Sequence, residues 1–164
     1  QVIDRALLSL KSNDFPIYYL SPRGVKLDAQ ISNSISKLDG MTLVCGKYEG
    51  VDERVIKHYN MIEISIGDYI LSGGDLAAMV LIDSVVRFLP NVLGNPLTLN
   101  EESFTNHLLE YPLYTQPREW KNYKVPDVLL SGDHKKIKNW KIKQSEDITM
   151  KRRPDLWKKY LKLK

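Results

Sequence analysis

Residues 65–75 read Ser65-Ile66-Gly67-Asp68-Tyr69-Ile70-Leu71-Ser72-Gly73-Gly74-Asp75. They join two segments whose apolar residues recur at different spacings. Before the first glycine, Ile62, Ile64 and Ile66 alternate with polar residues, which is typical of a half-buried strand. After the glycine pair, apolar residues recur at helical spacing from Leu76 to Val86. The sequence therefore predicts a strand, a glycine loop and a buried helix in succession.

The glycine loop lacks the spacing of the common phosphate-binding motifs. It is not G-x-G-x-x-G, and no Lys-Ser/Thr pair follows Gly73-Gly74 as a P-loop requires. Glycines let main chain approach a ligand closely, so backbone groups here fit the recognition of a nucleoside edge better than that of a phosphate chain. An ordinary turn and helix cap is the alternative for this stretch alone.

Two more strands are expected upstream. The segment 17–20 reads as a short strand that ends in the turn Ser21-Pro22-Arg23-Gly24, and 41–46 is a near-continuous apolar run of the type buried in parallel sheets. Helical patterns at 27–38 and 52–58 separate the strands, which predicts a parallel α/β sheet. Ligands bind beyond the carboxyl ends of such strands, so the three following loops are expected to form one pocket.

The composition narrows the class of protein. A chain of 164 residues with 43% hydrophobic content can bury one core and a small second unit. No run of about 18 apolar residues is present, so no membrane partner is expected. The single cysteine, Cys45, ends an apolar run and is interpreted as a buried strand thiol, which fits a reducing, cytoplasmic location.

The net charge of +4 conceals an asymmetry along the chain. Residues 1–117 carry 9 lysines and arginines against 14 acidic residues, whereas residues 118–164 carry 15 against 6. A strongly basic C-terminal part favours a polyanionic partner over a merely solvated surface. The candidates for phosphate contacts are Lys135, Lys136, Lys138, Lys141, Lys143, Lys151, Arg152 and Arg153.

The basic part is expected to be helical. Ser131-Gly132-Asp133 resembles an N-cap, and Pro154 is suited to the first turn of a last helix. Trp140 and Trp157 could stack on bases, but their helical spacing favours packing within the domain. Residues 94–106 show no clear helical pattern, and we predict that they form a linker between two domains.

Four motifs, in order, resemble the bacterial tRNA (guanine-N1)-methyltransferases, the TrmD family, over nearly the whole chain. The motifs are Tyr19 to Gly24, Cys45 to Arg54, Ser65 to Gly74, and Val128 to Gly132 with His134 and Trp140.

The resemblance implies a SPOUT-type α/β fold with a C-terminal trefoil knot, followed by a small helical C-terminal domain. The implied domains are an S-adenosylmethionine-binding domain at 1–93, the linker at 94–106 and a tRNA-binding domain at 107–164. The chain opens in a helical pattern without an initiator Met, so the N-terminal part of the first domain is expected to be missing. The resemblance further implies a homodimer with the active site at the subunit interface.

The resemblance also assigns a binding site for the cofactor, S-adenosyl-L-methionine. Its residues are Tyr19, Leu20, Ser21, Pro22, Gly46, Tyr48, Glu49, Gly50, Ile66, Gly67, Asp68, Tyr69, Ile70, Leu71, Gly73 and Gly74. For Tyr19 and Tyr48, packing at a strand end is an alternative role. The resemblance also suggests Mg²⁺ as a further cofactor. His58, His107 and His134 are too scattered in the sequence to form a set of metal ligands, so no ligands are assigned.

The chemistry requires a base and a cation. N1 of guanine carries a proton at neutral pH and becomes a good nucleophile only when a base removes it, which drives charge onto O6. By resemblance Arg87 is the catalytic arginine, and Glu102 occupies the position of a family aspartate, so Glu102 is our candidate general base. Alternatively, the neighbouring Glu101 shares this role, or both acids merely begin a helix.

The function expected from the sequence is methyl transfer to N1 of the guanosine 3′-adjacent to the anticodon (position 37) of tRNA. A non-catalytic RNA-binding module on an α/β scaffold is the alternative from another class. A SPOUT enzyme that methylates ribose hydroxyls is disfavoured by the linker acid. Binding of S-adenosylmethionine separates the first two functions.

Overall fold

The computed structural model describes residues 2–10, 15–47, 50–94, 99 and 102–164. The chain divides into two compact units, unit 1 at Gln1–Gly94 and unit 2 at Asn95–Lys164. The assignment of cofactor binding to one unit and tRNA binding to the other stays a prediction.

Unit 1 is built on a parallel sheet of three strands in the order β2-β1-β3. The central strand β1 (Ile17–Lys26) pairs with β2 (Thr42–Val44) on one side and with β3 (Ile62–Ser65) on the other. The expected parallel α/β layout is therefore confirmed. The trefoil knot that the resemblance implies stays a prediction.

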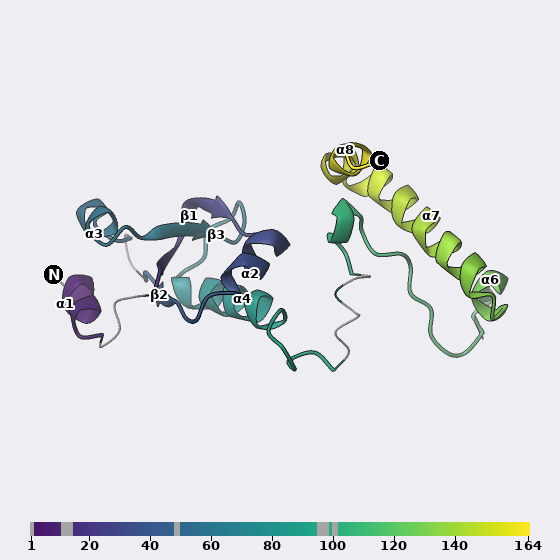
Figure 1. Cartoon of the computed structure of the whole chain (residues 1–164), viewed down its shortest axis with the longest axis horizontal. Coiled ribbons are helices and arrows are strands. Elements are labelled where there is room, and N and C mark those ends of the chain that lie inside the picture. The colour runs from purple at the N-terminus through teal and green to yellow at the C-terminus, as the bar shows by residue number, and fades with distance from the viewer. Residues whose placement is uncertain (1, 11–14, 48–49, 95–98, 100–101) are drawn as a thin grey trace. The chain divides into compact units, whose positions relative to one another are not determined.

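Helices cover both faces of this sheet (Figure 1). They are α1 (Val2–Leu8), α2 (Ala29–Ile35), α3 (Glu53–His58) and α4 (Gly74–Val86). Tyr18 and Leu20 of β1 pack with α2 and α4, whereas Tyr19 between them packs with α1 and α3. Because successive strand residues point to opposite faces, this one strand supplies both hydrophobic cores.

The strand β1 continues beyond its expected end. The sequence predicted a turn at Ser21 to Gly24, but the strand runs on to Lys26, and Leu20 and Val25 both oppose Ile64 of β3. The residues between them form an irregularity within the strand. The arrangement requires glycine at position 24, because an added Cβ would overlap the peptide joining Glu63 and Ile64.

Cys45 is also placed differently from its interpretation as a buried thiol. It is exposed, and it follows Val44, the last residue of β2. The apolar run 41–46 is therefore longer than the strand it contains, and its last residues belong to a loop.

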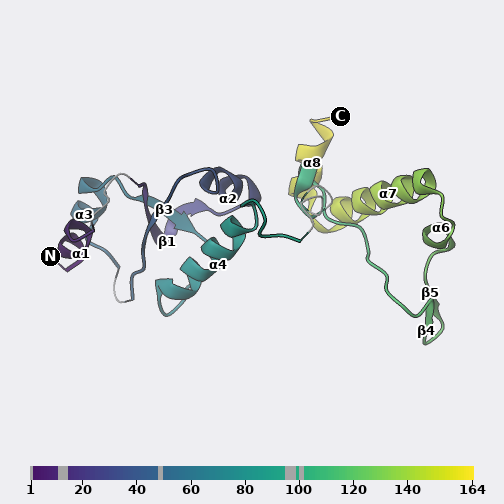
Figure 2. The same ribbon diagram turned by 60° about the horizontal axis from the view of Figure 1, so that its bottom comes forward.

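Unit 2 is mainly helical (Figure 2). Its elements are a 3-10 turn η1 (Thr105–His107), the hairpin strands β4 (Glu119–Trp120) and β5 (Tyr123–Lys124), and the helices α6 (Asp127–Leu130), α7 (His134–Arg152) and α8 (Pro154–Leu161). Asp133 caps α7 by accepting a hydrogen bond from the Lys136 amide at 3.0 Å, and Pro154 begins α8, as predicted. The hairpin and α6 were not predicted.

Side-chain hydrogen bonds join α7 to neighbouring segments of unit 2. The fully buried Thr149 hydroxyl donates to the Ser145 carbonyl at 2.6 Å and accepts from the Leu109 amide at 2.8 Å. Tyr160 and Lys164 both donate to one carboxylate oxygen of Glu146, at 2.6 and 2.7 Å. The ammonium of Lys164, and then the hydroxyl of Tyr160, lower the pKa of Glu146. These contacts fasten α8 to α7.

Substitution of Gly24 tests the close packing of β1 against β3. We expect Gly24→Ala to lower the free energy of unfolding by about 3 kcal/mol, because the new methyl group meets backbone, which cannot rotate away. The measurement is urea unfolding followed by circular dichroism. The control is Gly94→Ala, since a Cβ there meets nothing within 4 Å. Equal midpoints for the two variants would contradict this packing.

Candidate functional site

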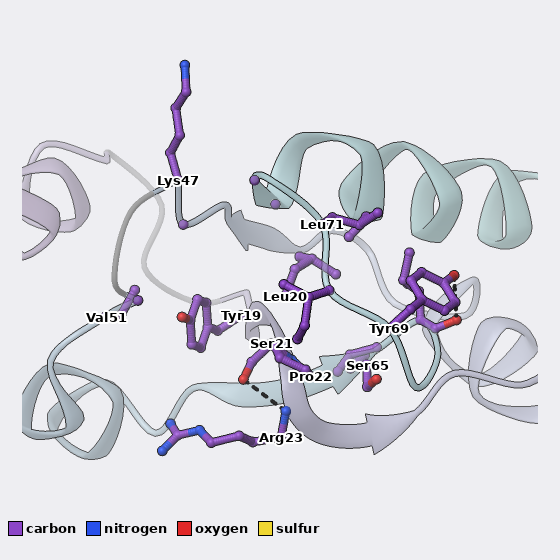
Figure 3. A pocket seen from close by; sticks show the side chains of 18 of the residues that line it. Tyr19, Leu20, Ser21, Pro22, Arg23, Lys47, Val51, Ser65, Tyr69 and Leu71 are labelled. Carbon is purple, nitrogen blue, oxygen red and sulfur yellow. Dashed lines mark hydrogen bonds between the residues drawn. The ribbon is translucent and has the colours of Figure 1, made fainter.

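A cavity of about 810 Å³ lies where β2 and β3 end, beside residues 19–23 of β1 (Figure 3). Its volume is within the range of small-molecule sites. The lining residues come from three chain segments and from the first turns of α3 and α4: residues 19–23; 46, 47, 50, 51 and 53; and 64–67, 69–74 and 77. The three segments expected to meet do meet in unit 1, but the first of them is part of the strand β1 and not a loop.

The first wall of the cavity is the irregular part of β1. Tyr19, Leu20 and Ser21 are buried there, and the Ser21 hydroxyl accepts a hydrogen bond from the Arg23 amide at 3.2 Å (Figure 3). The Arg23 guanidinium pairs with Glu53 at 3.2 Å and with Glu63 at 3.1 Å. These two ion pairs join β1, α3 and β3 at the edge of the cavity.

The second wall follows β2 and is fixed by the start of α4. The Gly74 amide donates to the Gly46 carbonyl at 2.7 Å. A Cβ on Gly74 would lie 2.9 Å from Cα of Cys45 and 3.1 Å from the Gly46 nitrogen, so only glycine allows this approach. The wall continues through Gly50 and Val51 to α3.

Asp52 caps α3 directly after this wall. Its carboxylate accepts from the Arg54 amide at 2.8 Å and from the Arg54 guanidinium at 3.0 and 2.6 Å. The guanidinium, and then the amide, lower the pKa of Asp52 to about 2. The cap therefore fixes the backbone immediately after Val51.

The third wall is the glycine loop after β3. The buried Ser65 hydroxyl donates to the Gly67 carbonyl at 3.1 Å, and the Gly67 amide approaches the same hydroxyl oxygen at 3.2 Å. The Tyr69 hydroxyl donates to the Ile66 carbonyl at 3.1 Å, which folds the loop back on itself. Ile70 beyond it remains 80% exposed.

Most of the residues predicted to bind the cofactor line this cavity. They are Tyr19, Leu20, Ser21, Pro22, Gly46, Gly50, Ile66, Gly67, Tyr69, Ile70, Leu71, Gly73 and Gly74. Asp68 does not line it, and its carboxylate lies 3.5 Å from the Lys26 ammonium. Tyr48 and Glu49 lie outside the described residues.

Several residues of the lining were not predicted: Arg23, Lys47, Val51, Glu53, Ile64, Ser65, Ser72 and Ala77. Each of them lies within a few residues of a predicted cofactor-binding residue. The predicted strand ends, which located the loops, could therefore have identified these neighbours as well. Figure 3 shows that the Lys47 side chain points away from Tyr19 and Ser21.

The two predicted catalytic residues lie elsewhere. Arg87 is the C-cap of α4, whereas the cavity lies at the N-terminal end of this helix. The 13 residues of α4 span roughly 20 Å, so the cavity and Arg87 of one chain are well separated. Glu102 belongs to unit 2, where it lines a second cavity of about 420 Å³ with Tyr111, Lys138 and Lys141 among others. Glu101 lies outside the described residues.

The eight basic residues predicted to contact tRNA lie on α7 or at its C-terminal cap. All except Lys141 and Arg153 are exposed. The Lys141 ammonium lies 4.4 Å from the centre of the Tyr111 ring, and the Arg153 guanidinium pairs with Asp155 at 2.6 Å. Trp140 and Trp157 are half-buried, with ring centres 6.2 Å from Tyr114 and 5.4 Å from Tyr160, respectively.

Neither a metal site nor a membrane-spanning helix is found in the part of the chain that the structure describes. No three or more His, Cys, Asp or Glu side chains gather there in a way that could hold a metal ion. The described residues thus do not fit a Mg²⁺ site made of protein ligands. None of the described helices is both long and apolar enough to cross a bilayer.

A parallel α/β sheet with a cavity beyond its carboxyl edge defines a class of proteins that bind small ligands, commonly nucleotides, at that edge. Within this class, residues 1–159 match the family model of tRNA (Guanine-1)-methyltransferase TrmD. The chain belongs to this family of methyltransferases.

Curated relatives from bacteria support the assignment. The chain is 54% identical over 161 residues to the tRNA (guanine-N(1)-)-methyltransferase of Pelagibacter ubique, 51% over 149 residues to that of Ruegeria pomeroyi and 51% over 160 residues to that of Rhodospirillum rubrum. These alignments cover 98%, 91% and 98% of the chain, but 71%, 61% and 67% of the respective relatives. The chain thus spans about two thirds of the length of these proteins.

The pKa of Asp52 tests the cap beside the second wall. We expect its carboxyl carbon to titrate with a midpoint near 2 by NMR, and with a higher midpoint in Arg54→Gln, which removes the guanidinium but keeps the backbone amide that also lowers this pKa. Because the folded-state pKa is the lower one, the stabilisation by this cap is present above about pH 4 and is lost as the pH falls toward 2.

Asp155 provides the control within the same spectra. Its pKa is lowered to about 2 by Arg153 in unit 2, so its midpoint is expected to be identical in both proteins. An Asp52 midpoint that Arg54→Gln leaves unchanged would contradict the described cap.

Proposed function

We propose that this chain transfers a methyl group from S-adenosyl-L-methionine to N1 of the guanosine 3′-adjacent to the anticodon (position 37) of tRNA. The observation that carries the proposal is the cavity beside β1 at the ends of β2 and β3, lined by 13 of the 16 predicted cofactor residues in a chain of the TrmD family. The tRNA (guanine-N(1)-)-methyltransferase names of the relatives support the substrate.

The cavity is suited to S-adenosylmethionine in size and chemistry. Leu20, Ile64 and Ala77 offer apolar surface to an adenine ring, and the glycines at 73 and 74 bring backbone close to the ligand. The charged groups of Arg23 and Glu53 at the edge are of both signs, as are the carboxylate and ammonium of the methionine part. When bound, the cofactor supplies an electrophilic methyl group on a sulfonium.

The protein residues have to activate the guanine. We assign Glu102 the role of general base, which accepts the N1 proton so that the ring nitrogen can attack the methyl carbon while the methyl–sulfur bond breaks and its electron pair stays on sulfur as a neutral thioether. Arg87 stabilises the negative charge that this proton transfer moves onto O6. The second cavity supports the assignment, because it places Lys138 and Lys141 on the same concave surface as Glu102. Cations there can hold the RNA phosphates that flank the target base.

A homodimer accounts for the separation of Arg87 from the cofactor cavity within unit 1. On α4, which carries Arg87 at its end, Leu76, Met79, Val80 and Ile82 are 42–64% exposed. A helix that is apolar on its outer face as well as its inner face is normally covered. We infer that a second copy covers this face, so that Arg87 and Glu102 complete an active site shared between subunits. A cytoplasmic location and the knot are part of the same proposal.

The role of Glu102 is tested by single-turnover methyl transfer to a tRNA transcript with G at position 37. We expect Glu102→Gln to lower the rate about 10²- to 10⁴-fold, the usual contribution of a general base, while S-adenosylmethionine binding is unchanged. Glu102→Asp should retain much more of the rate, because it keeps the carboxylate.

Glu110→Gln is the matched control, since it removes another acid of unit 2 and should leave the rate within about threefold of the parent. Full activity of Glu102→Gln would reject this residue as the base. Absence of cofactor binding in the parent chain would instead favour the non-catalytic RNA-binding module.

A further inference from the structure

The hairpin β4–β5 presents two large aromatic side chains that the packing of unit 2 does not use. Trp120 is 59% exposed and Tyr123 is 76% exposed. They are direct partners in the antiparallel pair, so both side chains project from the same face of the hairpin. Every residue from 113 to 124 is exposed, and Figure 2 shows the hairpin beyond α6, away from α8.

The geometry of the turn fixes this presentation. Lys121 and Asn122 between the strands both have positive φ, 47° and 67°, which is the two-residue hairpin turn that matches the twist of the strands. The Val125 amide donates to the Arg118 carbonyl at 2.9 Å and closes the base of the hairpin. An isolated two-stranded hairpin is marginal in water, and both rings remain more than half exposed, so they bury little apolar area against the rest of unit 2.

A cation lies over one ring of the aromatic pair, and further basic residues are close to it in the sequence. The Lys121 ammonium lies 4.9 Å from the centre of the Trp120 ring, and Lys124 approaches Glu119 across the strands at 3.7 Å. In the part of the chain that the structure describes, no carboxylate pairs with Arg118 or Lys121. A cation over one face of the indole leaves the opposite face for another flat group.

We propose that Trp120 and Tyr123 stack on an unpaired base of the RNA substrate. This inference rests on the proposed function and adds a contact outside the basic residues of α7. Aromatic rings stack on bases of single-stranded loops, whereas bases within a duplex are already stacked and inaccessible. The flanking cations favour RNA over a protein partner, because lysine is depleted at the centre of protein interfaces.

The test compares tRNA affinity, by fluorescence anisotropy, of the full chain and two double variants. Trp120→Ala/Tyr123→Ala removes both rings and should weaken binding about 10- to 100-fold. Trp120→Phe/Tyr123→Phe is the matched control, which keeps two flat faces and should remain within about threefold of the parent. Circular dichroism and thermal unfolding show whether each variant folds.

The salt dependence identifies the kind of contact. Stacking releases no counterions, so the slope of log Kd against log salt should be the same for the parent and the alanine variant. Lys124→Gln, by contrast, should make the slope shallower if its ammonium contacts a phosphate. A weaker affinity of the alanine variant that is accompanied by a shallower slope would overturn stacking in favour of phosphate contacts.

Two further outcomes would overturn the proposal. Equal tRNA affinity of the parent and the alanine variant rejects the stacking contact and leaves the proposed function intact. Dissociation of a parent dimer by the alanine substitutions, with affinity restored at concentrations that restore the dimer, would assign the hairpin to a subunit interface. Failure of the parent chain itself to bind tRNA would reject the proposed function together with this inference.

Discussion

The contact between Gly74 and Gly46 is the constraint on which the candidate site depends. A 2.7 Å hydrogen bond joins the first residue of α4 to the loop after β2, and a side chain at position 74 would collide with the backbone of Cys45. Because α4 also carries the fully buried Leu81 into the core, its position is set at both the loop and the sheet. The loops after β2 and β3 are thereby held against one cavity.

The same helix separates the parts of the proposed reaction. Its N-terminal end contributes to the cavity, its outer face exposes apolar side chains, and its C-terminal end carries Arg87. Glu102 and the basic helix α7 belong to the other unit. Because α4 holds Arg87 away from the cavity of its own chain, our proposal draws the cofactor and this cation from two subunits, with the contact between them on the exposed face of α4.

Local patterns in the sequence predicted most of the elements of the fold. Some features that these patterns did not predict depend on contacts between residues that are distant in the sequence. Alternation at 62–66, the Asp133 cap and Pro154 predicted β3, α7 and α8 because each signal is local. The continuation of β1 past Pro22 depends on how Gly24 packs against another strand, which no local pattern encodes. The hairpin turn at Lys121-Asn122 lacks the Asn-Gly signal, and Cys45 follows a strand shorter than its apolar run. The predicted strand ends indicated most of the residues that line the cavity. The separation of Arg87 from the cavity, by contrast, follows from the length of α4 in the structure.

Binding of S-adenosylmethionine to the parent chain and to Gly74→Ala, measured by isothermal titration calorimetry, tests the central claim most directly. If the Gly46–Gly74 contact shapes the cofactor cavity, the parent binds one equivalent per chain, and the added methyl group weakens binding at least about tenfold. Gly94→Ala, at a position with open space, should bind as the parent does. Equal affinity of a folded Gly74→Ala variant, or no binding by the parent, would contradict the assignment of this cavity to the cofactor.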